Sequence, residues 1–234
     1  MEQSPTRSED RHVDDEPAPS TAPLALQLAA RVERTHPPTT VGICAATALA
    51  TIALLDDERS QPGGEWHDAV SAWNGARIRK IVRRARASAW RRAQEADGIT
   101  VERDGVEVRA FVPGPLDQAP PEVAKLQIQS TDLDEVEPAA ELGAVTGLVV
   151  AVTPEAAMSW GKQAAQCAHA AQRAWITAAE TVLAEWDAAG RPITIVHPDR
   201  SLWAALAERA DVTIRDGGYT EIPAGTNTTI AWWA

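Results

Sequence analysis

The sequence has few cysteines, no long apolar segment and no signal for export. Cys44 and Cys167 are the only cysteines among 234 residues, too few for a disulfide framework. The longest apolar run, residues 41–55, is shorter than the roughly 20 residues that cross a bilayer. No basic start followed by an apolar segment marks a signal peptide. We therefore expect a cytoplasmic protein with reduced, buried thiols and no membrane contact.

The sequence also lacks an excess of positive charge. The formal net charge is −11, the wrong sign for a protein that wraps nucleic acid, so any RNA contact needs a local basic patch. Residues 77–92 supply one, because eight basic residues and no acid fall there (Arg77, Arg79, Lys80, Arg83, Arg84, Arg86, Arg91, Arg92). A phosphate-facing surface, with Arg83, Arg84 and Arg86 as substrate-binding candidates, and an ordinary solvated face both fit this run.

The chain divides into a tail and two folded segments. Residues 1–22 are rich in acids, proline and serine, so they cannot bury a core and are predicted to be disordered. Residues 23–130 and 146–234 each alternate strand patterns with helix patterns. The acidic stretch 131–145 is predicted to be the linker between these two domains.

Strands and helices are expected in the same order in both domains. In the first, we expect strands at 24–30, 78–83, 99–102, 106–112 and 125–129, and helices at 41–55, 65–72 and 88–96. In the second, we expect strands at 148–152, 193–197, 212–215 and 228–233, two helices within 160–189 and one at 199–210. A hairpin or tight turn is expected at Asp104-Gly105.

The two domains look like two copies of one unit. Trp73 and Trp90 are 17 residues apart, and so are Trp186 and Trp203. An Asp-Gly turn follows each pair, at residues 104–105 and 216–217. We predict an α/β fold of two small three-layer α/β/α units, each with a mixed sheet, packed as an intramolecular pseudo-dimer. The chain is accordingly expected to be a monomer.

The copies differ in their polar residues. Aligned on the two cysteines, the first copy has Ala46 where the second has His169. The first copy also has no lysine at the start of its helix. We therefore expect the first copy to be a degenerate, non-catalytic half.

The second copy contains two polar motifs. Residues 158–171 read MSWGKQAAQCAHAA, and Lys162, Gln166 and His169 stand at i, i+4 and i+7, on one face of a helix. Alone, this spacing is typical of an amphipathic helix with a solvated polar face. Residues 214–226 read IRDGGYTEIPAGT, with Asp216 before a Gly-Gly turn.

Together these two motifs resemble the type 2 peptidyl-tRNA hydrolases. That family has a helix that opens on Gly-Lys and runs through Ala-Ala-Gln-Cys-x-His-Ala. A later Asp-x-Gly-x-Thr-x-Ile segment is followed by Gly-Thr. The resemblance covers residues 146–234, a whole domain of that family. It implies hydrolysis of the ester bond of peptidyl-tRNA, a step of translation that releases peptide and tRNA.

The resemblance also implies which residues act. Lys162, His169, Asp216 and Thr220 are the catalytic candidates, and the substrate-binding candidates are Gln166, Gly225 and Thr226. An ester hydrolase needs an activated water and a stabilised carbonyl oxygen. Lys162 could hold a phosphate or an oxyanion, and Asp216 could orient or deprotonate water. No histidines and cysteines have metal-ligand spacing, so neither a metal nor a cofactor is expected.

Each candidate also has a plainer interpretation. The lysine can be a surface side chain, the histidine an ordinary hydrogen-bonding residue, the aspartate a turn former and the threonine a strand residue. The motif departs from the family as well, since Trp160 and Tyr219 replace basic residues. The alternative is therefore a catalytically inactive relative that binds a nucleotide, RNA or protein. We favour the enzyme because every catalytic candidate is kept.

Overall fold

The structure is a computed structural model that describes residues 22–75, 79–128, 133–134, 136–218 and 221–234. Its first unit contains β1 (Leu24–Arg31), α1 (Thr40–Asp56), the 3₁₀ turn η1 (Glu58–Ser60), α2 (His67–Gly75), β2 (Lys80–Ala85), α3 (Ala87–Ala93), β3 (Gly98–Arg103), β4 (Val106–Phe111), β5 (Gly114–Pro115), η2 (Leu116–Gln118) and α4 (Pro121–Ala124). Its second unit contains β6 (Leu148–Val152), α5 (Trp160–Thr177), α6 (Glu180–Ala188), β7 (Ile193–Val196), α7 (Arg200–Ala207), β8 (Val212–Arg215) and β9 (Asn227–Trp233).

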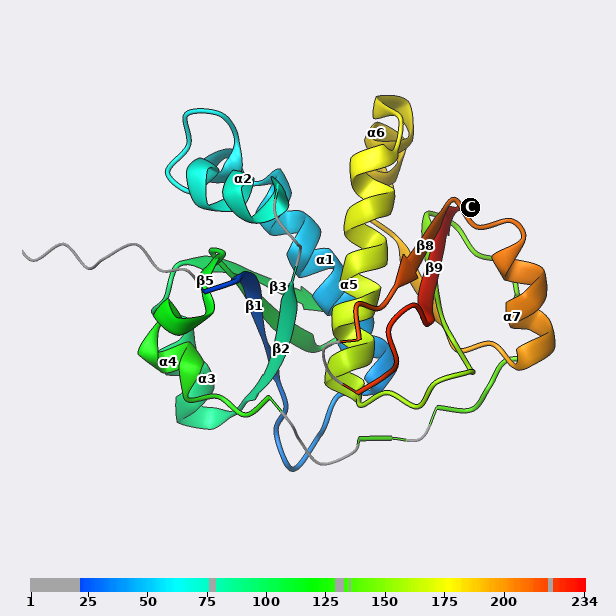
Figure 1. The fold of residues 1–234 in the computed structure, drawn as a ribbon, viewed down its shortest axis with the longest axis horizontal. Helices are drawn as coiled ribbons and strands as arrows, with labels where there is room; N and C mark the ends of the chain where they lie inside the picture. Colours follow the sequence, from blue (N-terminus) through cyan, green and yellow to red (C-terminus); the bar gives the residue numbers. More distant parts are fainter. Residues whose placement is uncertain (1–21, 76–78, 129–132, 135, 219–220) are drawn as a thin grey trace, which may run out of the picture.

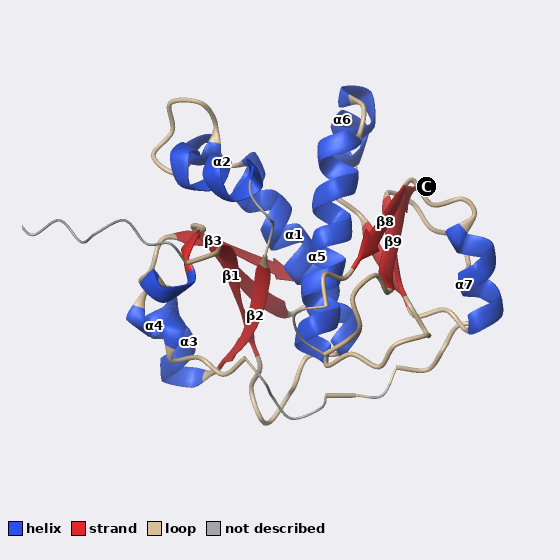
Figure 2. Ribbon diagram, viewed as in Figure 1, coloured by secondary structure: helices blue, strands red, loops and turns tan. Residues whose placement is uncertain are grey.

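The two sheets have the same topology. The first has the order β2-β1-β4-β3, with the short β5 also paired to β1, and the second has the order β7-β6-β9-β8. In each sheet the first strand in the chain is parallel to the second and antiparallel to the last. The third and fourth strands pair antiparallel. The predicted fold class, two similar α/β units with mixed sheets, is thereby confirmed (Figure 2).

The helices form the layers around these sheets. Helices α1 and α5 pack on each other between the two sheets (Figure 1). On the outer face of the first sheet, Trp90 of α3 and Val123 of α4 pack around Ala29 and Phe111. Helix α7 covers the outer face of the second sheet. The two units therefore join through their inner helices, as a pseudo-dimer does.

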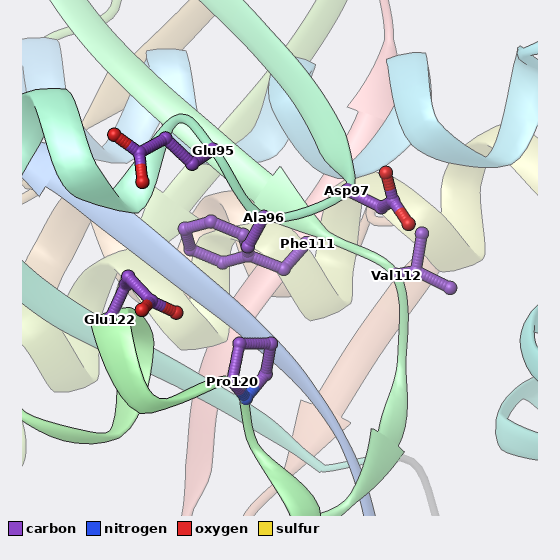
Figure 3. A pocket seen from close by; sticks show the side chains of 7 residues that line it. All are labelled: Glu95, Ala96, Asp97, Phe111, Val112, Pro120 and Glu122. Atoms are coloured by element: carbon purple, nitrogen blue, oxygen red, sulfur yellow. The ribbon is translucent and has the colours of Figure 1, made fainter.

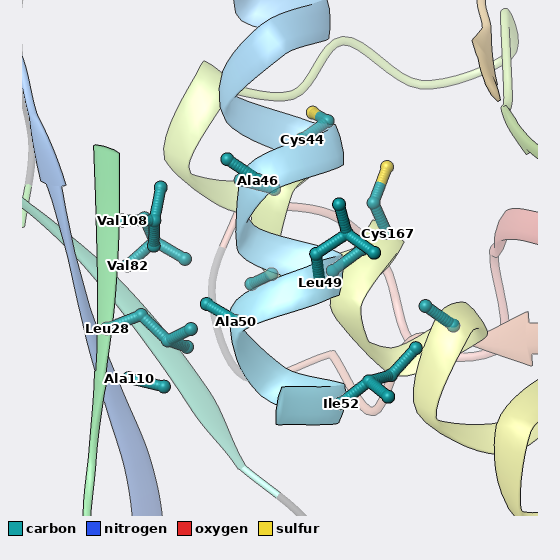
Figure 4. Packing of buried hydrophobic residues seen from close by; sticks show 14 of the residues in the cluster. Leu28, Cys44, Ala46, Leu49, Ala50, Ile52, Val82, Val108, Ala110 and Cys167 are labelled. Carbon is teal, nitrogen blue, oxygen red and sulfur yellow. The ribbon is translucent and has the colours of Figure 1, made fainter. Parts of the chain in front are cut away.

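Helix α1 is apolar on every side because the protein encloses it. A helix that is hydrophobic all round belongs in an interior, and most of α1 is buried. Figure 4 shows Ala46 and Ala50 turned towards Leu28 and Val108 of the first sheet. Small side chains on this face let the helix lie close to the strands. Thr39 caps the start of α1, its side chain accepting a hydrogen bond from the amide of Gly42 at 3.0 Å.

The same tryptophan contact recurs in the two units. In the first unit, Trp73 Nε1 donates to the carbonyl of Arg79 at 3.1 Å, and that carbonyl also accepts from the amide of Leu26. In the second, Trp186 Nε1 donates to the carbonyl of Pro192 at 2.7 Å, which accepts from the amide of Leu148. Each tryptophan thus fastens a helix to the junction between the first two strands of its sheet.

Two details of the prediction need correction. The strand expected at 125–129 is not formed, because among its described residues only Gln127 pairs, in a single bridge to Arg84. The alignment on the two cysteines is displaced. Counted from the helix caps Thr39 and Ser159, Leu49 and not Ala46 takes the place of His169.

The acidic linker is fastened to both units. Asp134 Oδ1 accepts from the amide and the hydroxyl of Thr40 at the start of α1, at 2.7 and 3.0 Å. Ala139 exchanges backbone hydrogen bonds with His197 and Asp199 next to the second sheet. The predicted tail lies outside the described residues apart from Ala22. None of the helices in the described part of the chain is long and apolar enough to span a membrane.

Candidate functional site

The N-terminal turns of α5 carry the first candidate residues. Ser159 caps the helix, and its hydroxyl accepts from the amide of Lys162 at 3.3 Å. The carboxylate of Glu221 in turn accepts from the amide and the hydroxyl of Ser159, at 2.8 and 2.6 Å. Trp160, at the position where the family has a lysine, is buried. The start of α5 is therefore fixed by the segment that follows Asp216.

Lys162 and Asp216 form a buried ion pair. Lys162 Nζ donates to Asp216 Oδ2, and the two side chains are only 13% and 5% exposed. The same oxygen accepts from Gln166 Nε2 at 2.7 Å. The helix motif and the Asp-Gly motif, about 50 residues apart in the chain, therefore meet at one carboxylate oxygen.

Gln166 connects this pair to the sheet. Its Oε1 accepts from the hydroxyl of Thr228 at 2.8 Å, and its backbone carbonyl accepts from Thr229 Oγ1 at 3.1 Å. Both threonines belong to β9 and are fully buried. Because Oε1 is already an acceptor, the amide NH₂ of Gln166 is directed at Asp216. Gln166 therefore orients the carboxylate of Asp216.

The loop after β8 fixes the other oxygen of Asp216. Oδ1 accepts from the amide of Gly218 at 2.7 Å. The backbone of Asp216 pairs with the carbonyl of Thr226 and the amide of Gly225, at 2.9 and 2.8 Å. Gly218 has a φ of +75°, and a Cβ there would stand 2.6 Å from Ala224, so only glycine fits. Gly225 and Thr226, proposed from the motif as substrate-binding residues, hold the Asp216 loop closed.

His169 contacts the first unit. Its Nδ1 lies 3.1 Å from Nζ of Lys80, a residue of β2 in the first unit. Burial holds the pKa of His169 well below its usual value, and the neighbouring Lys80 and Lys162 lower that pKa further. Sequence reasoning placed Lys80 only within the basic run, so its contact with the second unit was missed.

The remaining predicted residues are separated. Thr220 and Tyr219 lie outside the described residues. Arg83 is buried on the outer side of the first sheet, where it donates to Gln27 Oε1 at 2.8 Å and to the carbonyl of Leu126 at 2.9 Å. Arg84 is half-buried and Arg86 is exposed. The surface expected from three neighbouring arginines thus comes down to Arg84 and Arg86.

A hollow of about 720 Å³ opens beside these two arginines. Arg34 also lines it, with Glu33 and Asp134 as its acids. Both acids are engaged, Glu33 with Arg31 and the amide of Ala87, and Asp134 with Thr40. The hollow lies at the carboxyl ends of β1 and β2, and β2 packs against α5. We refer to it as the basic hollow.

A second hollow has the opposite character. It measures about 430 Å³, and Figure 3 shows Glu95, Asp97 and Glu122 around Phe111 and Pro120. Three carboxylates repel phosphate, so this hollow offers nothing to a nucleic acid. The basic hollow is the better match to an anionic chain.

Comparison with known proteins agrees with the motifs. Residues 146–232 match the model of one protein family, described as peptidyl-tRNA hydrolase PTH2. The match contains α5, the Asp216 loop and most of β9. A search of curated proteins finds no match. The family resemblance predicted from the sequence is confirmed, since residues 146–232 match the model of the peptidyl-tRNA hydrolase PTH2 family.

Proposed function

We propose that this protein hydrolyses the ester bond of peptidyl-tRNA, releasing the peptide and the tRNA. The observation that carries the proposal is the convergence of Lys162 and Gln166 on one buried oxygen of Asp216. A buried ion pair is costly unless it is well hydrogen-bonded, and this one is held by a glutamine, a glycine amide and two strand threonines. Such support is typical of a site whose geometry matters.

In this proposal the two charged groups divide the chemistry. The ester carbonyl develops negative charge as water attacks, and the ammonium of Lys162 is the donor that stabilises that charge. Asp216 orients the attacking water and accepts its proton. Gln166 and Gly218 keep the carboxylate in place before and after proton transfer.

The first unit supplies RNA contacts in this proposal. The second unit carries more acids than bases, so it attracts tRNA poorly by itself. Arg34, Arg84 and Arg86 border the basic hollow. The start of α5 lies close to β2, since a Cβ built on Gly161 would stand 3.5 Å from the carbonyl oxygen of Val82. The tRNA backbone would therefore follow the first unit and present its 3′ end to α5.

We also propose the division of labour that this implies. Residues 23–130 form a non-catalytic copy of the unit, residues 131–145 a linker and residues 146–234 the catalytic copy. The shared strand order and the recurring tryptophan contact support a common origin of the two units. Counted from the helix caps, the first copy has the non-polar residues Gly42, Ala46 and Leu49 at the positions of Lys162, Gln166 and His169.

The test is release of peptide from a defined peptidyl-tRNA. Wild type should release it, and Lys162→Met and Asp216→Asn should each lower kcat/KM by about 100-fold or more, the usual cost of one transition-state donor. Lys125→Met is the matched control. Lys125 is exposed in the first unit, so the same change of side chain there should leave the rate unaltered.

A folding control separates chemistry from stability. Removing one partner of a buried ion pair costs about 3–5 kcal/mol, because the other charge is left unpaired. The double variant Lys162→Met with Asp216→Asn removes both charges and should fold better than either single variant, yet stay inactive. If wild type releases no more peptide than the double variant, the protein is not a hydrolase. The alternative function, an inactive relative that binds RNA or protein, then takes its place.

A further inference from the structure

Lys80 is an unusual residue for the position it occupies. It stands at the start of β2, its side chain is buried, and it points from the first unit into α5 of the second. Among the described residues no carboxylate pairs with it. Buried lysines without such a partner are rare, because desolvation of the ammonium is costly. Burial accordingly holds the pKa of Lys80 well below its usual value.

The neighbours of Lys80 are acceptors and an aromatic ring. Its Nζ donates to Gln172 Oε1, lies 3.1 Å from His169 Nδ1, and stands 5.1 Å from the centre of the Trp73 ring. Gln172 Nε2 donates to Asn74 Oδ1 at 2.8 Å, which directs Oε1 of the same amide towards Lys80. A chain of hydrogen bonds therefore runs from α2 through Gln172 and Lys80 to His169.

This chain determines what His169 can do. A neutral imidazole has one N–H and one acceptor nitrogen, and the partner of one nitrogen decides the state of the other. Lys80 carries at least two N–H groups whether it is an ammonium or an amine, one for Gln172 and one for His169. If Nδ1 accepts from Lys80, the ring proton must be on Nε2.

We propose that Lys80 of the first unit is a positioning residue for His169 of the second unit, donating to Nδ1 and so fixing the ring with its proton on Nε2. The inference rests on the proposed hydrolase function, in which His169 lies one helical turn beyond Gln166 on the same face of α5. Nε2–H is then the group that His169 offers to the leaving ribose oxygen or to the water. The first unit thereby completes the site of the second, beyond its RNA contacts.

The first experiment reads the tautomer directly. The full chain is labelled with ¹⁵N-histidine, and long-range ¹H–¹⁵N correlations are recorded from pH 5 to 8. With five histidines in the chain, His169→Gln identifies the signal. Wild type should show His169 neutral and protonated at Nε2. Lys80→Met should give a mixture of the Nδ1–H and Nε2–H tautomers of His169. It should also raise the pKa of His169 towards its usual value.

Two outcomes of this experiment would overturn the proposal. One is a wild-type ring with its proton on Nδ1, which a donating Lys80 forbids. The other is a Lys80→Met spectrum identical to that of the wild type. If Lys80→Met does not fold, Lys80→Arg keeps the donor and should keep the Nε2–H tautomer, so loss of that tautomer in a folded Lys80→Arg also counts against the proposal.

The second experiment reads the reaction. Lys80→Met should lower kcat for peptide release about tenfold with KM unchanged, a fraction of what proton transfer contributes. Lys125→Met, the same change at an exposed lysine of the first unit, should alter neither constant. An unchanged kcat in Lys80→Met would contradict the positioning role. A wild type without activity would instead sink the hydrolase and this role together, while the spectrum would still decide the Lys80–His169 contact.

Discussion

At the scale of single residues, two half-buried histidines should make the stability depend on pH. Burial lowers the pKa of His169 and of His197 in the folded protein. The unfolded chain takes up these protons near pH 6.5, and the folded protein does not. Stability should therefore fall as the pH drops from 7 to 5, by at most about 1.4 kcal/mol per pH unit for each histidine.

Urea unfolding at pH 7, 6 and 5 measures this effect. His169→Gln and His197→Gln should each flatten the dependence, and the double variant should flatten it most. His197 also contacts Gln163 through Nε2 at 2.7 Å, so its variant should be less stable than wild type at pH 7. The same slope in all four proteins would show that neither histidine is held neutral by the fold.

The residues of the site differ in how far the sequence could predict them. Lys162, Gln166 and Asp216 were predictable from the resemblance of two local motifs to the family, whereas their spacing alone indicated only an amphipathic helix and an Asp-Gly turn. Lys80 and Arg83 could not be placed, because the basic run looks the same whichever side of β2 each residue takes. The strand has covered faces on both sides, and only the packing of two units shows that Lys80 enters the interface.

At the scale of elements, the recurring tryptophan contact allows a paired test. Trp73→Phe and Trp186→Phe each remove one hydrogen bond to a carbonyl that also serves the first strand. A buried hydrogen bond contributes about 1 kcal/mol, the carbonyl keeps its bond to the strand amide, and the smaller phenylalanine ring leaves part of the tryptophan site unfilled. Both variants should therefore lose about 1–3 kcal/mol of unfolding free energy, and by similar amounts.

Trp175→Phe is the control for this pair. Trp175 lies in α5 and is only half-buried. Its replacement should therefore cost clearly less unfolding free energy than replacement of the buried Trp73 or Trp186. Denaturant unfolding of the three variants gives the comparison. A large loss for Trp186→Phe with none for Trp73→Phe would mean that the two contacts are not equivalent, and would weaken the proposal of a common origin.

The order of the elements was predictable, and some of their limits were not. Ser159 and Asp199 are local helix caps, and apolar periodicity marks the helices and strands between them. The expected strand at 125–129 failed because Leu126 is buried against the outer helices and only Gln127 reaches β2. The cysteine alignment was displaced because Cys44 and Cys167 both lie in the packed core. A core position for a small residue does not require cysteine, so two cysteines need not be equivalent positions.

At the scale of the whole molecule, the acidic chain must bind an anionic substrate through one local surface. Each phosphate that a basic side chain neutralises contributes about 0.7–0.9 to the slope of log affinity against log salt concentration. Arg84 and Arg86 border the basic hollow, so Arg84→Gln with Arg86→Gln should weaken tRNA binding and reduce that slope by about 1.5. Binding measured between 50 and 200 mM salt, roughly the range where such contacts are lost, tests this.

The control for that experiment is an exposed arginine of the second unit. Arg209 follows α7, on the outer layer of the second unit, and lies over the ring of Trp232 at 5.5 Å. Arg209→Gln makes the same change in net charge as either single variant, so it corrects for the general field of the molecule. If it reduces the slope as much as one substitution at the basic hollow does, tRNA binding depends on net charge and not on this surface. If the double variant leaves the slope unchanged, the first unit does not guide tRNA to α5, and the surplus of acids over bases in the second unit then has no compensation from Arg84 and Arg86.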